Sequence, residues 1–267
     1  MGHARLGTTF DPFLLDNPNF SQNTIDGLNQ DFQRGAIAVK VWKNVGMEIK
    51  NSAGEYVNVD DPIFQPIYQD IAAHNKTLIV HAADPDAAWT AKYAKGAKYY
   101  AENPEWDMSK KPDAQQRSAI LDARDRLVAM NPNLRVIGAH FGSMETQLGE
   151  IGKRLDRYPN FAVDTASRVE GLTLLPRDQV RAFILKYQDR ILYGSDLSFD
   201  SETWHDDVTA EAREHQYQIE WRYFSTDDTF DYHGHRVEGL NLPLTVLEKL
   251  YHDNAMRWVP GIDASVR

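Results

Sequence analysis

The 267-residue chain contains no cysteine, and this absence excludes several kinds of site at once. Disulfides, zinc–thiolate centres, iron–sulfur clusters and a cysteine nucleophile all require thiols. Any metal in this protein must therefore be bound by histidine, aspartate or glutamate side chains.

Long hydrophobic runs and basic runs are also missing. No apolar stretch approaches the about 20 residues that a bilayer-spanning helix needs, and the N-terminus lacks the pattern of a signal peptide. The formal net charge is −10, and no cluster of lysine and arginine offsets it, so a nucleic-acid backbone is not an expected partner. We therefore expect a cytoplasmic protein that acts on a small-molecule substrate, without a membrane or nucleic-acid partner.

Short β-branched segments alternate along the chain with longer segments of helical periodicity, which predicts parallel strands joined by right-handed helical crossovers. The expected strands are 5–10, 36–42, 77–82, 134–140, 161–165 and 191–194. The expected helices are 22–34, 62–75, 114–130, 144–158, 176–187, 206–220 and 243–258. The sequence has no repeat and no interdomain linker, so residues 1–267 are expected to form one α/β domain of the (β/α)-barrel type.

Two long segments, 43–61 and 84–111, follow the carboxyl ends of expected strands. They are expected to be loops, the first with the alternative of a small hairpin. Loops of this length in a compact domain tend to be functional, and barrel enzymes place their chemistry at this end of the strands.

Three of the expected strands end in a residue that can bind a metal, namely His81, His140 and Asp196. Because parallel strands of a barrel end at the same rim, we expect these side chains to lie close together. Two imidazoles and a carboxylate suit zinc or another divalent ion, which lowers the pKa of a bound water so that a nearby carboxylate can take its proton. Each residue also has a structural interpretation, as a hydrogen-bonded buried histidine or as a turn or cap aspartate.

Other residues are weaker candidates for the site. Lys40 lies within an apolar strand, where a lysine needs either a role in the site or a structural carboxylate partner, and both alternatives are open. Asp164 and Arg168 flank the end of another strand and could pair with each other or meet substrate. The expected substrate contacts are Lys40, Trp42, Trp89 and Arg168. The spacing of His233-Gly-His235 is one that metal ligands use, but its polar surroundings favour a solvated turn.

Six stretches of the chain form a specific pattern when they are taken in order. They are Ala38–Gly46, Leu78–His81, Val136–Glu145, Arg154–Asp164, Lys186–Asp196 and Tyr251–Trp258. Together they resemble the amidohydrolase-related group, amidohydrolase family 2, in the branch that includes aminocarboxymuconate-semialdehyde decarboxylase. The resemblance extends from about Phe10 to Gly261, which is nearly the whole chain.

This resemblance implies a distorted (β/α)8 barrel with one or two divalent metals at its carboxyl rim. It implies that His81 is a metal ligand, that His140 either binds metal or polarises the substrate, and that Asp196 binds metal and acts as general base. We expect zinc, with manganese as the alternative. The expected function is metal-dependent hydrolysis of a small organic ester, lactone or amide, with His140 stabilising the developing oxyanion. The alternatives are non-oxidative decarboxylation of an aromatic or unsaturated acid, and a non-catalytic remnant.

The chain departs from the family pattern near its start. The family opens with a first strand that carries His-x-His or Glu-x-His, and no such motif is present here. Six strands are expected, whereas a closed barrel of this type has eight. We therefore expect an N-terminally incomplete domain that lacks the first two βα units. Because an open sheet exposes its edges, we expect either a truncated chain or a homo-oligomer rather than a self-sufficient monomer.

Overall fold

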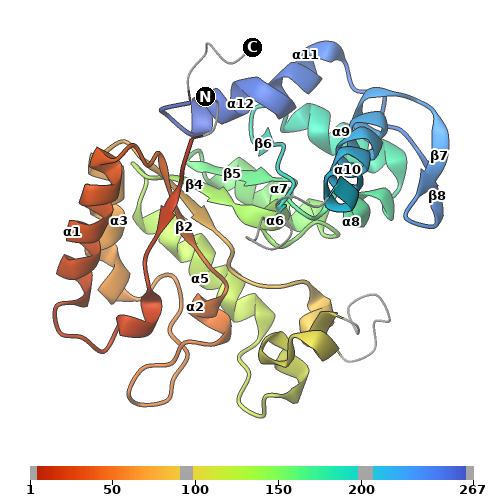
Figure 1. Ribbon diagram of the computed structural model, residues 1–267. Helices are drawn as coiled ribbons and strands as arrows, with labels where there is room; N and C mark the ends of the chain where they lie inside the picture. The colour runs from red at the N-terminus through yellow and green to blue at the C-terminus, as the bar shows by residue number, and fades with distance from the viewer. Residues whose placement is uncertain (1–4, 91–98, 198–206, 263–267) are drawn as a thin grey trace.

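The computed structural model describes residues 5–90, 99–197 and 207–262 (Figure 1). Residues 91–98 of the expected loop 84–111 therefore lie outside the described residues, as does the first residue of the expected helix 206–220. Within the described residues, no helix is both long enough and apolar enough to cross a membrane.

Six parallel strands form one sheet, and they are neighbours in the order in which they occur along the chain. They are β1 (Thr8–Thr9), β2 (Ala38–Val41), β3 (Thr77–Val80), β4 (Arg135–Gly138), β5 (Phe161–Asp164) and β6 (Ile191–Leu192). All six expected strands are confirmed, although each is shorter than expected. Parallel pairing in sequence order is the arrangement of a (β/α) barrel, which confirms the expected fold class. In the part of the chain that the structure describes, β1 and β6 are the two edges and the sheet is not closed.

Long helices follow the strands, as the sequence predicts. They are α1 (Phe20–Gln33), α3 (Gln65–Ala73), α5 (Arg117–Met130), α7 (Leu148–Arg157), α9 (Arg177–Lys186) and α10 (Asp207–Ser225). Figure 1 shows α1 and α3 side by side next to β1 and β2. Two helix ends differ from expectation by several residues: α7 begins at Leu148 rather than at residue 144, and α10 ends at Ser225 rather than at residue 220. The expected helix 243–258 is divided into three shorter elements.

Shorter elements occupy the connections and the C-terminal region. They are η1 (Pro12–Leu14), α2 (Asn44–Met47), η2 (Pro62–Phe64), η3 (Asp86–Ala88), η4 (Pro104–Trp106), η5 (Met108–Lys110), α6 (Ala139–Gly142), α8 (Val169–Thr173), α11 (Leu244–Glu248), the π-helix η6 (Lys249–Asp253) and α12 (Asn254–Trp258). The loop 43–61 contains α2 and a single antiparallel bridge between Lys50 and Tyr56.

A separate hairpin joins β7 (Thr229–Tyr232) to β8 (His235–Glu238). The sequence predicts only a turn in this region. His233 and Gly234 form that turn and are exposed, as expected, whereas His235 begins β8, is partly buried and lies 2.8 Å from Thr173 Oγ1 through its Nε2. The strands themselves are an unexpected addition at the edge of the molecule (Figure 1).

The two faces of the parallel sheet differ in what covers them. Alternate strand residues point to opposite faces, and one face packs into the large hydrophobic core beneath the helices. The other face forms a small apolar cluster with Trp258 and Val259. The carbonyl of Trp258 accepts a hydrogen bond from Thr77 Oγ1, and its indole N–H donates to the carbonyl of Asp189. Because Thr77 and Asp189 lie at or before the amino ends of their strands, α12 covers that end of the second face and leaves the carboxyl end to polar residues.

Candidate functional site

The three predicted metal ligands lie at the carboxyl rim of the sheet, with His140 next to both His81 and Asp196. His81 directly follows β3, His140 follows β4 and Asp196 follows β6. The ring centroids of His81 and His140 are 4.1 Å apart, and His140 Nδ1 lies 3.9 Å from Asp196 Oδ2. Both histidines are buried, whereas the Asp196 side chain is 45% exposed. The site therefore has a buried imidazole pair with a carboxylate at its solvent side.

The backbone that carries His140 has an unusual conformation. The φ angles of His140, Phe141, Gly142 and Ser143 all lie between 58° and 60°, in the left-handed region that L-residues rarely adopt. This turn delays the start of α7, which explains why the helix begins later than expected. A Cβ atom on Gly142 would lie 2.9 Å from Ile151 Cδ1, so a larger residue here would also require the Ile151 side chain to move.

Side chains from other elements hold this left-handed turn. Arg124 and Arg117, both on α5, donate to the carbonyl oxygens of Gly142 and Ser143, respectively. Asp164, the last residue of β5, accepts a hydrogen bond of 2.8 Å from the backbone N–H of His140. Strained backbone persists where the surroundings hold it, and such positions cluster at functional sites.

The hydrogen bonds of His140 fix its protonation. Its Nδ1 lies 2.9 Å from the carbonyl oxygen of Ala166. Because a carbonyl only accepts, Nδ1 carries the proton and Nε2 keeps its lone pair. Burial lowers the pKa of His140 to about 2, with a further contribution from the positive charge of Arg168. His140 is therefore a neutral imidazole with one nitrogen free to bind a metal.

His81 is also held neutral by its surroundings. Burial lowers the pKa of its imidazole, although the nearby Asp84 carboxylate acts in the opposite direction. Its Nε2 lies 3.3 Å from Asp84 Oδ1. The distance is short, but the alignment is not that of a good hydrogen bond.

Lys40, in β2, lies near enough to Asp164 and Asp196 for their charges to act on it, and both alternatives that the sequence left open remain predictions. Burial lowers the pKa of Lys40, while the charges of Asp164 and Asp196 raise it. Burial raises the pKa of Asp164, and Lys40 opposes that shift. Lys40 Nζ also lies 5.4 Å from the ring centroid of Trp42, which is half exposed. Lys40 and Trp42 thus form one side of the rim.

Arg168 and Trp89 have different surroundings. Arg168 Nε lies 3.6 Å from Glu145 Oε2, a carboxylate buried beside the site. The sequence left open whether Arg168 and Asp164 pair with each other or meet substrate. Asp164 accepts hydrogen bonds from the backbone N–H groups of His140 and Ala166, so the structure does not show direct pairing. Trp89 packs against the hydrophobic core and donates its indole N–H to the carbonyl of Gln115. Its described contacts do not join it to the two histidines.

Three residues of the site were not foreseen from the sequence, namely Lys43, Asp84 and Glu145. Asp84 follows His81 by three residues, and this spacing was the one available signal. Lys43 pairs with Asp84 over 2.7 Å, although they are far apart in the sequence. Such a pairing depends on the register of β2 against β3, which no local pattern reveals.

A divalent metal fits the donor chemistry of this rim. His81 and His140 are neutral, buried nitrogen donors, and Asp196 supplies a carboxylate oxygen. Within the described residues, however, no group of three or more His, Asp or Glu side chains is already gathered around one point. The donor atoms and protonation of these residues suit a metal. In the described residues, however, the three side chains do not surround one point.

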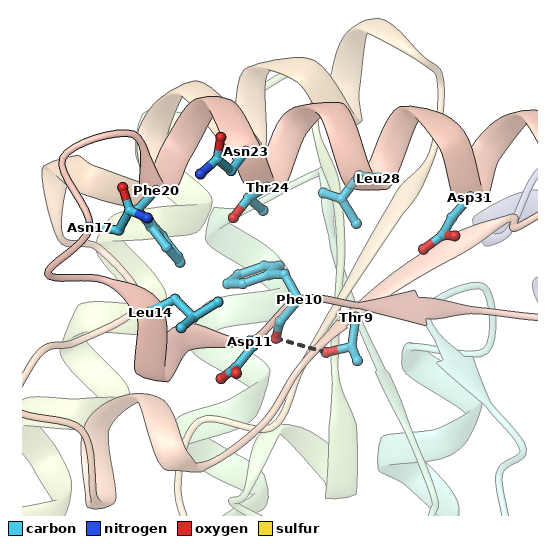
Figure 2. A pocket seen from close by; sticks show the side chains of 11 residues that line it. Thr9, Phe10, Asp11, Leu14, Asn17, Phe20, Asn23, Thr24, Leu28 and Asp31 are labelled. Atoms are coloured by element: carbon cyan, nitrogen blue, oxygen red, sulfur yellow. Dashed lines mark hydrogen bonds between the residues drawn. The ribbon is translucent and has the colours of Figure 1, made fainter.

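A cavity outside this rim lies between β1 and α1 (Figure 2). It has a volume of about 230 Å³, and Phe10, Leu14, Phe20 and Leu28 form its apolar wall. None of the predicted site residues lines it, so it is separate from the histidine pair.

The chain belongs to the amidohydrolase family, because a family model described as Amidohydrolase (Amidohydro_2) matches residues 36–261. This confirms the resemblance seen in the sequence. Comparison with proteins of curated function gives no match.

Solved structures with the same fold include an uncharacterised TIM-barrel protein from Bordetella bronchiseptica, which has 15% sequence identity and a TM-score of 0.52 over 91% of this chain and 63% of that one. An amidohydrolase II structure has 19% identity and a TM-score of 0.51 over 95% of this chain and 69% of that one. A 2,6-dihydroxybenzoate decarboxylase complexed with 2,6-dihydroxybenzoate has 14% identity and a TM-score of 0.51 over 92% and 68%, respectively. The chain spans 63–69% of the length of these structures. At these identities the likeness shows the fold.

Proposed function

We propose that this protein is a metal-dependent hydrolase of the amidohydrolase type that acts on a small organic ester, lactone or amide. The observation that carries the proposal is the position of His81, His140 and Asp196 at the carboxyl rim of a parallel sheet, where His140 lies next to both of the others. Family membership supports it, since the matched region includes all three residues.

His81 and His140 are proposed as the imidazole ligands, and Asp196 as the carboxylate ligand. Zinc is the expected metal and manganese the alternative. A divalent metal bound there would lower the pKa of a water and stabilise negative charge that develops on the substrate.

The surroundings of Asp196 support a role as general base. Its Oδ2 accepts a hydrogen bond of 3.1 Å from Ser167 Oγ, which restricts the orientation of the carboxylate. Its exposed side allows a water and a substrate to approach. We propose that Asp196 takes the proton of the attacking water.

The hydrogen bond of His140 favours one of its two expected roles. A neutral imidazole has a single N–H, and the carbonyl of Ala166 takes it. To stabilise an oxyanion as well, His140 would need a second N–H and so a protonated ring, and its lowered pKa opposes that protonation. We therefore propose the ligand role for His140.

The substrate is proposed to carry a carboxylate. Lys40 and Arg168 bring two cationic groups to the rim, and Arg168 Nε is buried without a hydrogen-bond partner among the described residues. A carboxylate can bind a guanidinium through charge-assisted hydrogen bonds, and Trp42 offers an exposed ring beside Lys40. The contact predicted for Trp89 remains a prediction.

Decarboxylation is the second candidate, because the same two cations suit an acid substrate. One of the proteins with this fold is a decarboxylase of 2,6-dihydroxybenzoate. A non-catalytic remnant is the third candidate, since no three-donor group is gathered in the described residues.

Product analysis with metal-loaded protein tests the proposal. Carboxylate-bearing lactones, esters, amides and aromatic acids are incubated in ¹⁸O-labelled water. A hydrolase incorporates ¹⁸O into the new carboxylate, whereas a decarboxylase releases carbon dioxide. We expect Asp196→Asn to lower the rate by about 10²-fold to 10⁴-fold, the usual contribution of a general base.

Asp189→Asn is the matched control, because Asp189 is half exposed, pairs with Lys249 and precedes β6 at the opposite end of the strand. Its rate should equal that of the wild type. Carbon dioxide release without ¹⁸O uptake would refute the hydrolase proposal and support decarboxylation. Absence of both products under metal loading would favour the remnant.

A further inference from the structure

A buried row of charges lies directly behind His81. Asp84 Oδ1 is 3.3 Å from His81 Nε2, and Asp84 Oδ2 is 2.7 Å from Lys43 Nζ. The three side chains are at most 10% exposed. A buried carboxylate that contacts both an imidazole and an ammonium group can orient the imidazole, while the ammonium group balances the charge of the carboxylate.

The position of Lys43 is fixed from several sides. Its Nζ lies 4.3 Å from the ring centroid of Trp106 and 5.1 Å from that of Tyr99, and it donates to the Tyr99 hydroxyl over 3.0 Å. Aromatic faces stabilise a cation that has lost its water. Lys43 is therefore an anchored counter-ion for Asp84 rather than a mobile surface lysine.

The backbone of Asp84 is fixed as well. Its carbonyl oxygen accepts a hydrogen bond of 2.9 Å from Arg117 Nε, and the same arginine donates to the carbonyl of Ser143 in the left-handed turn after His140. Arg117 thus connects the loops that carry the two histidines. Asp84 is held by its main chain and by its side chain at once.

We propose that Asp84, anchored by Lys43, is the positioning residue of His81. Its carboxylate accepts the proton on Nε2, which fixes the tautomer and orientation of the ring and leaves Nδ1 unprotonated as the donor atom. The buried Nε2 has no well-aligned hydrogen-bond partner among the described residues, and Asp84 Oδ1 lies 3.3 Å from it. A carboxylate behind a histidine ligand has this effect in many metal sites. The consequence for metal binding rests on the proposed function, but the effect on the tautomer does not.

A mere structural ion pair between Lys43 and Asp84 would leave the tautomer of His81 unchanged, so the tautomer is the measurement to make. Long-range ¹H–¹⁵N spectra of metal-free, ¹⁵N-labelled protein report which ring nitrogen of His81 is protonated. The wild type should show the Nε2–H form. Asp84→Ala should show a mixture of the two forms.

Zinc titration of the same proteins gives the second reading, in which we expect Asp84→Ala to weaken zinc affinity about 10-fold to 100-fold. Asp86→Ala is the control, because Asp86 lies two residues away, is exposed and pairs with Arg117. It should retain the wild-type tautomer and affinity. The double variant Lys43→Met/Asp84→Leu removes both charges, so no buried charge is left unpaired, and it should fold and lose the Nε2–H preference.

An Nδ1–H form of His81 in the wild type would overturn the inference, as would an unchanged tautomer in both Asp84 variants. If the tautomer depends on Asp84 but the wild type binds no zinc, the proposed function fails while the positioning role stands. If zinc binds but replacement of Asp84 leaves the tautomer unchanged, the positioning role fails while the proposed function stands.

Discussion

Replacement of Arg124 by methionine tests whether buried arginines hold the turn that carries His140. The Arg124 side chain is fully buried, and its guanidinium lies 5.2 Å from the ring centroid of Phe161. It donates to the carbonyl of Gly142 and pairs with Asp125 over 2.7 Å. Methionine keeps much of the aliphatic stem but removes every N–H donor.

The expected loss of stability follows from these contacts. The carbonyl of Gly142 loses a charged donor inside the protein, and an unsatisfied buried polar group costs about 1–3 kcal/mol. Breaking a buried ion pair costs about 3–5 kcal/mol when the remaining charge is uncompensated. Asp125 keeps Arg154 at 2.7 Å, so its charge stays compensated and the lower part of that range applies. We expect a decrease of about 3 kcal/mol in the free energy of unfolding.

Urea denaturation followed by circular dichroism measures this change. Arg126→Met is the matched control, because Arg126 lies on the same helix but is 57% exposed and pairs with Asp60 at the surface. An exposed ion pair contributes at most about 1 kcal/mol. A loss in Arg124→Met no larger than that in Arg126→Met would refute the claim that Arg124 holds the turn.

Two further predictions concern the same strand end. Burial holds the pKa of His140 at about 2, below the value of about 6.5 in an unfolded chain, so the folded protein binds fewer protons and loses stability as pH falls below about 6.5. Metal-free protein should lose about 1–2 kcal/mol between about pH 7 and pH 5, and His140→Gln should lose less; equal slopes in urea titrations would contradict this. A Cβ at Gly138 would lie 2.7 Å from Phe161 Cζ, so Gly138→Ala should lower stability by about 1–3 kcal/mol. Gly27→Ala, in α1 with no atom within 4 Å of the added Cβ, should be neutral or stabilising by up to about 1 kcal/mol, and the reverse ranking in thermal melts would show the contact to be unimportant.

The fold was readable from the sequence because its signals are local and repeated. Buried parallel strands are short apolar runs, and the helices between them show their own period. The start of α7 could not be read in this way. The residues from His140 to Ser143 adopt a left-handed turn, in which Arg124 and Arg117 hold the carbonyls of Gly142 and Ser143. That constraint comes from another helix.

The candidate site was predictable where its polar residues directly follow strands. His81, His140 and Asp196 lie at the same rim, as the parallel arrangement requires, although they are not gathered around one point in the described residues. Asp84 and Lys43 were not predictable, because their contact depends on how neighbouring loops pack. The family resemblance supplied the expected roles of the first three residues, and only the structure placed the carboxylate behind His81.

Zinc binding to the metal-free protein tests the central claim most directly, namely that His81, His140 and Asp196 form one metal site. Protein stripped with a chelator is titrated with zinc by calorimetry, beside His81→Ala, Asp196→Ala and the control His74→Ala, whose exposed imidazole caps α3. We predict about one zinc per chain in the wild type and in the control, with strongly weakened binding in the other two. Absence of zinc binding in the wild type, or equal binding by His81→Ala, would contradict the account.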